Sequence, residues 1–492
     1  MASTKTVLVI IAMILLLTGQ ILLYRKAKET SSVIPKLESF IGRCNYKSID
    51  KYLFDWKALM NPCKSSMSWL NEISIVAKDK FGTKANMTKI IYRQINREGQ
   101  CSTVIVQTYS RNGEPKSIGG DSWRAVLRGK VVHFAFVFDR MDGSYEVHFC
   151  PFQSGTYSLE LTLEFSLCDG ARDPPRGWFE KGDIHGHFQE QGALGVSSSF
   201  VLDPAVALPV EIPSAADIAA LPKKRPTESL EFGCHHFTDL KIPQCNIIFD
   251  KFGNWYGFKK KYKWASGHVV NQSEKSLPFR RYNKLWIYGD SLGHRWWKSV
   301  SGQMLCKKLF NLCTHTFTYT YEFKEYDYTK VNIGKGFNEA RFFAPIHSIF
   351  NDSEMNNRSV LVINFGLHLI ISLNFSQCQK IIDRFAQIVS DLKTKRNPAL
   401  VPLIIWKTTT FAPLEQGKFR TKSHSRFLTN QRIRLFNAYT NMRLCSEGIP
   451  IFDVYPVTAS YPLGSIDGLH YHEHVSSPAE EALKDFLVMN AG

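Results

Sequence analysis

Residues 281–492 alternate short apolar runs with longer amphipathic segments, and this alternation constrains the fold more than any other feature of the chain. The apolar runs have the length of strands; they are Leu285–Tyr288, Val360–Phe365, Leu403–Lys407 and Ile449–Val454. The other segments are compatible with helices; they are residues 291–309, Cys378–Lys393, Thr429–Cys445 and Pro478–Met489. Parallel strands need long crossover connections, which are usually helices. The pattern therefore predicts a three-layer α/β domain with a parallel sheet.

Residues 68–202 show a different pattern, in which short alternating runs are separated by turn residues. Val131–Phe138 and Ser144–Phe149 flank Asp142-Gly143, a dipeptide that favours a hairpin turn. Similar runs cover Ile73–Ala77, Thr103–Tyr109 and Thr156–Phe165. Several short strands at this spacing predict an antiparallel β-sandwich.

The segments on either side of this sandwich lack the alternation. Residues 31–67 contain two prolines and two cysteines, and we expect an irregular, disulfide-stapled stem. Residues 203–280 begin with five prolines between positions 204 and 226. That composition predicts a Pro-rich linker, followed by a connecting segment that contains cysteines.

The N-terminus carries an apolar run from Val7 to Tyr24, which is just long enough to span a bilayer. Because no convincing small-residue cleavage site follows, we expect residues 1–30 to be an uncleaved transmembrane signal anchor. The protein would then be a single-pass type II membrane protein with a lumenal body in the Golgi or endoplasmic reticulum. The cations directly after the run favour the opposite orientation, and cleavage near Gly19 would instead give a secreted protein.

Two further features of the chain favour a lumenal body. Five Asn-x-Ser/Thr sequons predict glycosylation at Asn86, Asn271, Asn351, Asn357 and Asn374. The 11 cysteines have no C-x-x-C spacing, and in an oxidising compartment most would form disulfides and leave one unpaired. The net charge of +17 favours an acidic partner. A lumenal location excludes nucleic acid and leaves acidic glycans and anionic membrane surfaces.

The first candidate catalytic residue is Ser291, in the sequence Gly289-Asp290-Ser291. It directly follows a predicted buried strand and stands at the start of a predicted helix. Active sites of parallel sheets collect at the carboxyl ends of strands, and a helix N-terminus favours a developing oxyanion. The alternative is that Asp290 or Ser291 is an ordinary helix N-cap.

Asp467 and His470 lie three positions apart near the end of the chain. A histidine that accepts a serine proton needs a carboxylate to orient its other ring nitrogen, and this spacing allows one loop to supply both groups. A solvent-exposed loop with unrelated polar residues is the alternative. Together with Ser291, the pair predicts a Ser-His-Asp triad for acyl-ester chemistry.

These motifs resemble the SGNH or GDSL hydrolases, and more closely their PC-esterase branch. The segment from Asn364 through Gly366 to His368 resembles that branch's third block, and an upstream sandwich resembles the neurexophilin and PC-esterase domain (NXPE) family, whose first domain is immunoglobulin- or filamin-like. The resemblance implies that Ser291 is the nucleophile, His470 the base and Asp467 its partner. Asn364, Gly366 or His368 would supply an oxyanion donor or position substrate, since His368 stands where the wider pattern has asparagine.

Three other groups of residues are weaker candidates. His294 and Arg295, one turn after Ser291, would bind an anionic group if they face the site, or else form a solvated helix face. The aromatic and lysine-rich stretch Trp255–Trp264 suits an acidic sugar or is a surface strand with its aromatics packed inward. The alternating histidines 470, 472 and 474 leave a zinc site as a minor alternative, but we predict no metal.

The resemblance implies a function in the secretory pathway. PC-esterase relatives add or remove acetyl groups on sugar hydroxyls, so we expect a glycan or glycoconjugate O-acetyltransferase or O-acetyl esterase that works through an acyl-serine. The motif demands no cofactor; a transferase, which the membrane anchor favours, needs an acyl donor such as acetyl-CoA. The expected substrate is a carbohydrate or glycoprotein, with acidic, sialylated glycans favoured by charge. The alternative is a non-catalytic, neurexophilin-like adhesion or ligand glycoprotein that keeps the α/β domain as a scaffold.

Overall fold

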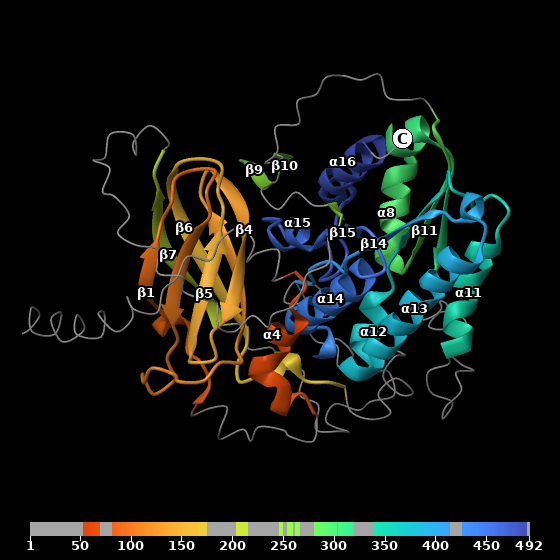
Figure 1. Ribbon diagram of the computed structural model, residues 1–492. Coiled ribbons are helices and arrows are strands. Elements are labelled where there is room, and N and C mark those ends of the chain that lie inside the picture. Colours follow the sequence, from red (N-terminus) through yellow and green to blue (C-terminus); the bar gives the residue numbers. More distant parts are fainter. Residues whose placement is uncertain are drawn as a thin grey trace, which may run out of the picture. The chain divides into compact units, whose positions relative to one another are not determined.

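A computed structural model describes residues 53–68, 81–174, 203–214, 246–248, 253–258, 261–265, 280–302, 304–318, 339–413 and 426–489 (Figure 1). The predicted signal anchor, residues 31–52 of the predicted stem, the predicted strand Ile73–Ala77 and Asn271 lie outside these residues. Within the described ranges, no helix combines the length and the apolar character that a membrane span requires. The described chain is a mixed α/β protein with one antiparallel and one parallel sheet.

The antiparallel sheet is built in the strand order β1-β2-β5-β4-β3-β6-β7. Its strands are β1 (Lys89–Gln94), β2 (Ser102–Gln107), β3 (Ser122–Arg128), β4 (Val131–Asp139), β5 (Ser144–Phe149), β6 (Gly155–Phe165) and β7 (Asp203–Ile212). Alternate side chains of β2 and β5 pack against those of β3 and β6 in one apolar core, for example Val104 and Val147 with Leu127 and Leu161. The antiparallel β-sandwich predicted from the alternation is therefore confirmed.

Disulfides join described parts of the chain, as the cysteine content predicts. They link Cys63 to Cys168, Cys101 to Cys150 and Cys306 to Cys313. Among the described cysteines, Cys378 is free, and it is buried. Burial raises the pKa of its thiol to about 12, so this thiol stays protonated and unreactive.

The start of the predicted linker is instead a strand. β7 pairs with β6 over most of its length, with Gly155 opposite Ile212. Proline cannot donate to a ladder, but β7 is the last strand of the order, and edge strands tolerate proline. Val210 and Ile212 alternate into the core, so residues 203–212 belong to the sandwich. The sandwich therefore extends ten residues beyond its predicted boundary at 202.

The predicted connecting segment also contains strands. β9 (Asn254–Phe258) and β10 (Lys261–Ala265) pair with each other, and β9 pairs with β4 through Val131 and Val132. β8 (Ile247–Ile248) instead joins the parallel sheet beside β15 (Ile451–Phe452). The connecting segment thus contributes to both sheets.

The parallel sheet has the order β12-β11-β13-β14-β15-β8, and every pairing within it is parallel. Its other strands are β11 (Tyr282–Gly289), β12 (Phe310–Phe317), β13 (Val360–Ile363) and β14 (Leu403–Lys407). If strands β11 to β15 are numbered 1 to 5 along the chain, their order in the sheet is 2-1-3-4-5, which is a doubly wound order. Such sheets bind ligands at the carboxyl ends of the strands where the order reverses, which here is between β11 and β13.

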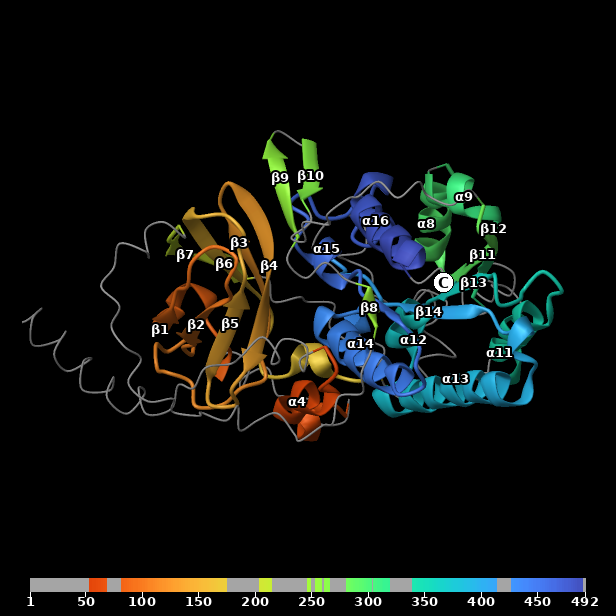
Figure 2. The same cartoon turned by 45° about the horizontal axis from the view of Figure 1, so that its top comes forward.

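Helices cover both faces of the parallel sheet, which confirms the predicted layers (Figure 2). On one face lie α8 (Ser291–Gly302), α9 (Met304–Leu309) and α16 (Glu473–Met489). On the other lie α11 (Glu339–Asn351), α12 (Gly366–Ser372), α13 (Phe375–Lys395) and α14 (Asn430–Cys445). Leu285 and Ile287 of β11 face the first group of helices, whereas Tyr288 faces the second.

The end of the predicted stem packs on the α/β layer instead of standing apart. α4 (Trp56–Met60) contacts α14, and the Trp56 ring lies edge-on to Tyr439 at 5.3 Å between ring centroids. Asn441 of α14 donates to the carbonyl of Leu53. Residues 53–60 are apolar enough to bury side chains, and that is why this stretch does not remain an exposed stem.

Buried arginines of the α/β domain bind the end of β6 and the residues that follow it. Arg426 forms an ion pair with Asp169 at 2.8 Å, and both side chains are buried. Arg432 of α14 donates to the carbonyls of Arg172, Ile370 and Leu373. Asn430 reaches Glu164 Oε1 of β6 at 2.7 Å. These contacts tie residues 164–173 to the α/β domain.

Candidate active site

Ser291 is the first residue of α8, and Asp290 separates it from the carboxyl end of β11. Asp290 caps this helix, because its Oδ1 accepts from the backbone N–H of Leu292 at 2.9 Å. Asp290 is buried, and burial raises the pKa of its carboxyl. The capping role therefore belongs to Asp290, and the hydroxyl of Ser291 is available for another contact.

Asp467 and His470 lie in the loop between α15 (Tyr455–Ala459) and α16. Asp467 Oδ1 accepts from the backbone N–H groups of Leu469 and His470, at 3.1 and 3.0 Å. Gly468 between them has a φ of +102°, in the region that glycine alone adopts without strain. The carboxylate thus folds the loop back on itself and brings its second oxygen to the imidazole.

The three predicted catalytic side chains form one continuous chain of contacts. His470 Nε2 lies 2.9 Å from Ser291 Oγ, and His470 Nδ1 lies 2.8 Å from Asp467 Oδ2. Burial raises the pKa of Asp467, but hydrogen bonds from His470 outweigh this effect and leave it below its usual value. The carboxylate is therefore ionised at neutral pH, and it favours the tautomer that carries a proton on Nδ1. In that tautomer Nε2 can accept the serine proton.

The predicted third block follows β13, beside the end of β11. The side-chain amide of Asn364 donates to the Lys407 carbonyl at 2.7 Å and to Thr409 Oγ1 at 3.2 Å, so it links β13 to the end of β14. Gly366 begins α12, and a Cβ there would lie 2.2 Å from Thr409 Oγ1. His368 is buried in the first turn of α12. Asn364 therefore has a structural use for its amide donors, and an oxyanion role for Gly366 or His368 stays a prediction.

The structure separates the predicted pair His294 and Arg295. The His294 ring packs among the aromatic rings of α8 and β12, with 5.0 Å between its centroid and those of His315 and Phe317. Arg295 is exposed and lines a cavity beside the triad. Of the two, Arg295 is placed to meet an anionic group.

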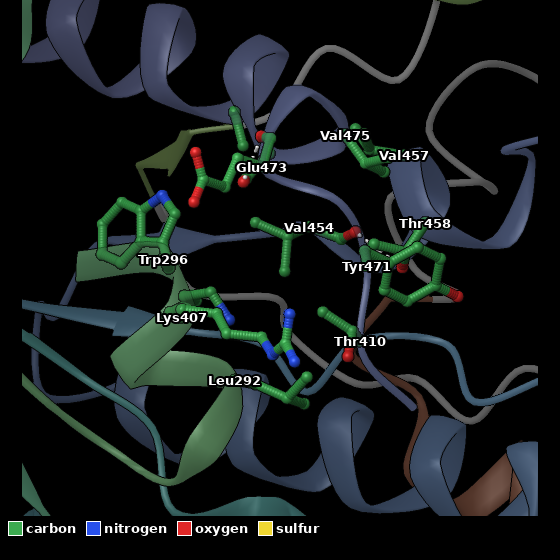
Figure 3. Close-up of a pocket in the computed structure, with 13 residues that line it drawn as sticks. Leu292, Trp296, Lys407, Thr410, Val454, Val457, Thr458, Tyr471, Glu473 and Val475 are labelled. Carbon is green, nitrogen blue, oxygen red and sulfur yellow. Dashed lines mark hydrogen bonds between the residues drawn. The ribbon is translucent and has the colours of Figure 1, made fainter. Parts of the chain in front are cut away.

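This cavity is small, with about 50 Å³ of space for the centres of water molecules (Figure 3). Leu292 and Tyr471, the residues that follow Ser291 and His470, both line it. So does Lys407, the last residue of β14, which sequence reasoning missed as a site residue. Its one signal in the sequence is that a charged residue ends an otherwise apolar run.

In the described part of the aromatic stretch Trp255–Trp264, the rings of Trp255, Tyr262 and Trp264 pack inward. Trp255 is buried, and its indole N–H donates to the Val457 carbonyl at 3.0 Å. Its ring lies 4.9 Å from that of Tyr461, between centroids. Tyr256, by contrast, is 42% exposed, so the predicted sugar-binding role stays a prediction for the outer face.

The remaining predictions concern a metal site and the glycosylation sites. Among the described residues, no group of three or more His, Cys, Asp or Glu could hold a metal. Asn86, Asn351 and Asn357 are exposed. Asn374 is half-buried and caps α13 by accepting from the backbone N–H of Gln377.

No protein-family model matches the chain, and no curated protein matches it. Among solved structures, the crystal structure of the Lin-41 filamin domain is similar to part of this chain, with 17% sequence identity and a TM-score of 0.15. The match covers 16% of this chain and 80% of that one.

Proposed function

We propose that this protein is an O-acetyltransferase or O-acetyl esterase that acts on glycans or glycoconjugates through an acyl-serine. The observation that carries the proposal is the chain of contacts from Ser291 through His470 to Asp467, at 2.9 and 2.8 Å. Ser291 begins α8, whereas His470 and Asp467 lie in the loop before α16, and Ser291 and His470 are 179 residues apart in the sequence. Hydrogen-bond reach between nucleophile, base and orienting carboxylate is what nucleophilic acyl transfer requires.

In this mechanism Ser291 Oγ attacks the acyl carbonyl while His470 Nε2 takes the hydroxyl proton. The C–O bond to Oγ forms, and the carbonyl oxygen becomes an oxyanion near the N-terminus of α8. His470 returns the proton to the leaving group as its bond to the acyl carbon breaks. An acceptor hydroxyl then gives its proton to His470 and attacks the acyl-serine carbonyl, and His470 returns that proton to Ser291 Oγ as the bond between Oγ and the acyl carbon breaks.

The acceptor decides between the two activities. Water as acceptor gives an esterase, and a sugar hydroxyl gives a transferase, which would take its acyl group from a donor such as acetyl-CoA. We favour the transferase, as part of the proposal that the chain belongs with the NXPE family. Its first domain would then be filamin-like and its second SGNH-like, on an anchored, lumenal type II protein with sialylated glycans as candidate substrates.

The test uses the full chain and an activated acetyl ester, p-nitrophenyl acetate, together with acetyl-CoA plus sialylated glycans. Ser291→Ala should lower both activities by about 10³-fold or more, because the nucleophile is lost. Ser301→Ala on the same helix is the matched control, since the Ser301 hydroxyl donates within the helix to the Trp297 carbonyl. Unchanged activity in Ser291→Ala would reject acyl-serine chemistry. Absence of both activities in the native protein would instead favour the non-catalytic, neurexophilin-like alternative.

A further inference from the structure

The cavity beside the triad combines an apolar wall with two cations. The wall consists mainly of Leu292, Trp296, Val454, Val457, Val475 and Ala479 (Figure 3). The cations are Lys407 from the carboxyl end of β14 and Arg295 from α8. Polar groups placed in an otherwise apolar cavity usually fix the orientation of a ligand.

Lys407 is the more unusual of the two cations, because only 6% of it is exposed. Within the described ranges, its ammonium forms neither an ion pair nor a hydrogen bond, and the negative charge of Asp290 acts on it from farther away. Burial lowers the pKa of Lys407 to about 8, and Asp290 limits that fall. The ammonium has three N–H donors, and among the described residues none of them has an acceptor, so they are open to a molecule in the cavity.

Arg295 stands at the same cavity one helical turn after Ser291. Its side chain is exposed, and a guanidinium offers the paired donors that match carboxylate and phosphate oxygens. Glu473 at the start of α16 is the acidic member of the lining, and it too is exposed. The buried part of the cavity is therefore cationic, and its acidic group lies where solvent screens it.

We propose that this cavity is an anion subsite, in which Lys407 and Arg295 bind a carboxylate or phosphate of the molecule whose ester reacts at Ser291. The inference rests on the proposed function and deepens it, because it names what the site recognises beside the acyl group. An anion supplies the acceptors that the Lys407 ammonium lacks, and the apolar wall strengthens the attraction by excluding water. The same subsite suits a carboxylate on an acceptor sugar and a phosphate on an acyl donor.

The experiment compares two esters that differ by one charge, 3-acetoxybenzoate and its neutral methyl ester. The intact protein should have a kcat/KM at least about 10-fold higher for the anion. Lys407→Met should remove most of that preference, measured as the ratio of kcat/KM for the anion to kcat/KM for the neutral ester. Arg295→Gln, an exposed substitution that threatens folding less, should reduce the preference in the same direction, and Glu473→Gln should increase it.

Lys298→Gln is the matched control, since Lys298 is an exposed cation on α8 outside the cavity lining. Competition with benzoate and with adenosine 3′,5′-bisphosphate assigns the anion to a carboxylate or to a phosphate donor. If neither Lys407→Met nor Arg295→Gln changes the ratio between the two esters, the anion subsite is wrong. If Ser291→Ala leaves hydrolysis of the neutral ester intact, the proposed acyl-serine itself is wrong.

Discussion

Asp467→Asn separates the shape of the catalytic loop from its charge. The amide oxygen can still accept from the backbone N–H groups of Leu469 and His470, so the loop should keep its fold. The amide NH2 group would then face His470 Nδ1, which lies 2.8 Å from the carboxylate of the native residue. That contact requires a lone pair on Nδ1. The ring proton moves to Nε2, where it faces Ser291 and blocks proton acceptance.

The expected loss is large in activity and small in stability. A wrong tautomer lowers kcat by about 10³- to 10⁴-fold, which corresponds to roughly 4–5.5 kcal/mol of transition-state free energy. Hydrolysis of p-nitrophenyl acetate measures this loss, and thermal unfolding measured in parallel should show little change. Asp467→Ala should also lose the loop contacts, with a further decrease of about 1–2 kcal/mol in unfolding free energy. An Asn variant with kcat within tenfold of the native protein would refute the tautomer argument.

Three further substitutions test the surroundings of the site. Arg432→Met should lower the unfolding free energy in urea by about 3–5 kcal/mol, because the buried guanidinium donates to three carbonyls. Arg443→Met on the same helix, where the ion pairs are partly exposed, should lower it by less than about 1 kcal/mol. Equal losses in the two variants would contradict the importance of the buried guanidinium. Trp255→Phe removes the donor to Val457 and should lower unfolding free energy by about 1–2 kcal/mol; no loss would mean that this bond is dispensable. Burial raises the pKa of Glu480 to about 7, so the charge of its carboxylate destabilises the fold increasingly between pH 4.5 and 7. Glu480→Gln should therefore raise the unfolding free energy by up to about 3 kcal/mol at pH 8 but not at pH 4. A gain that does not depend on pH would exclude titration of Glu480 as its cause.

The strands that sequence reasoning found are those with a complete local pattern. The bounds of Leu403–Lys407 and Ser144–Phe149 agree with the structure, because one run is apolar up to its last residue and the other follows a hairpin turn. β12 was missed because it is an edge strand with two exposed residues near its start, and its sequence has no apolar run. β7 was missed because its prolines suggest a linker, and its pairing with β6 is long-range.

Of the candidate site, too, only a part could be predicted from the sequence. Ser291, Asp467 and His470 could be placed together because their chemistry predicts mutual contact whatever the distance along the chain. The cavity could not be predicted, because Lys407 reaches it through the register of β14 in the sheet and the packing of α8 against α16. His294 and Arg295 are adjacent in the sequence, and only the rotation of α8 determines that they face different surroundings.

The two-residue strand β8 has a consequence for anyone who expresses the α/β domain alone. A fragment that begins at residue 281 has the triad and the other five strands of the parallel sheet, but it lacks Ile247 and Ile248. The backbone of β15 would then be an open edge, and unpaired edges promote association between chains. Such a fragment should precipitate or form oligomers even with every catalytic residue present, so its inactivity would say nothing about the chemistry of Ser291.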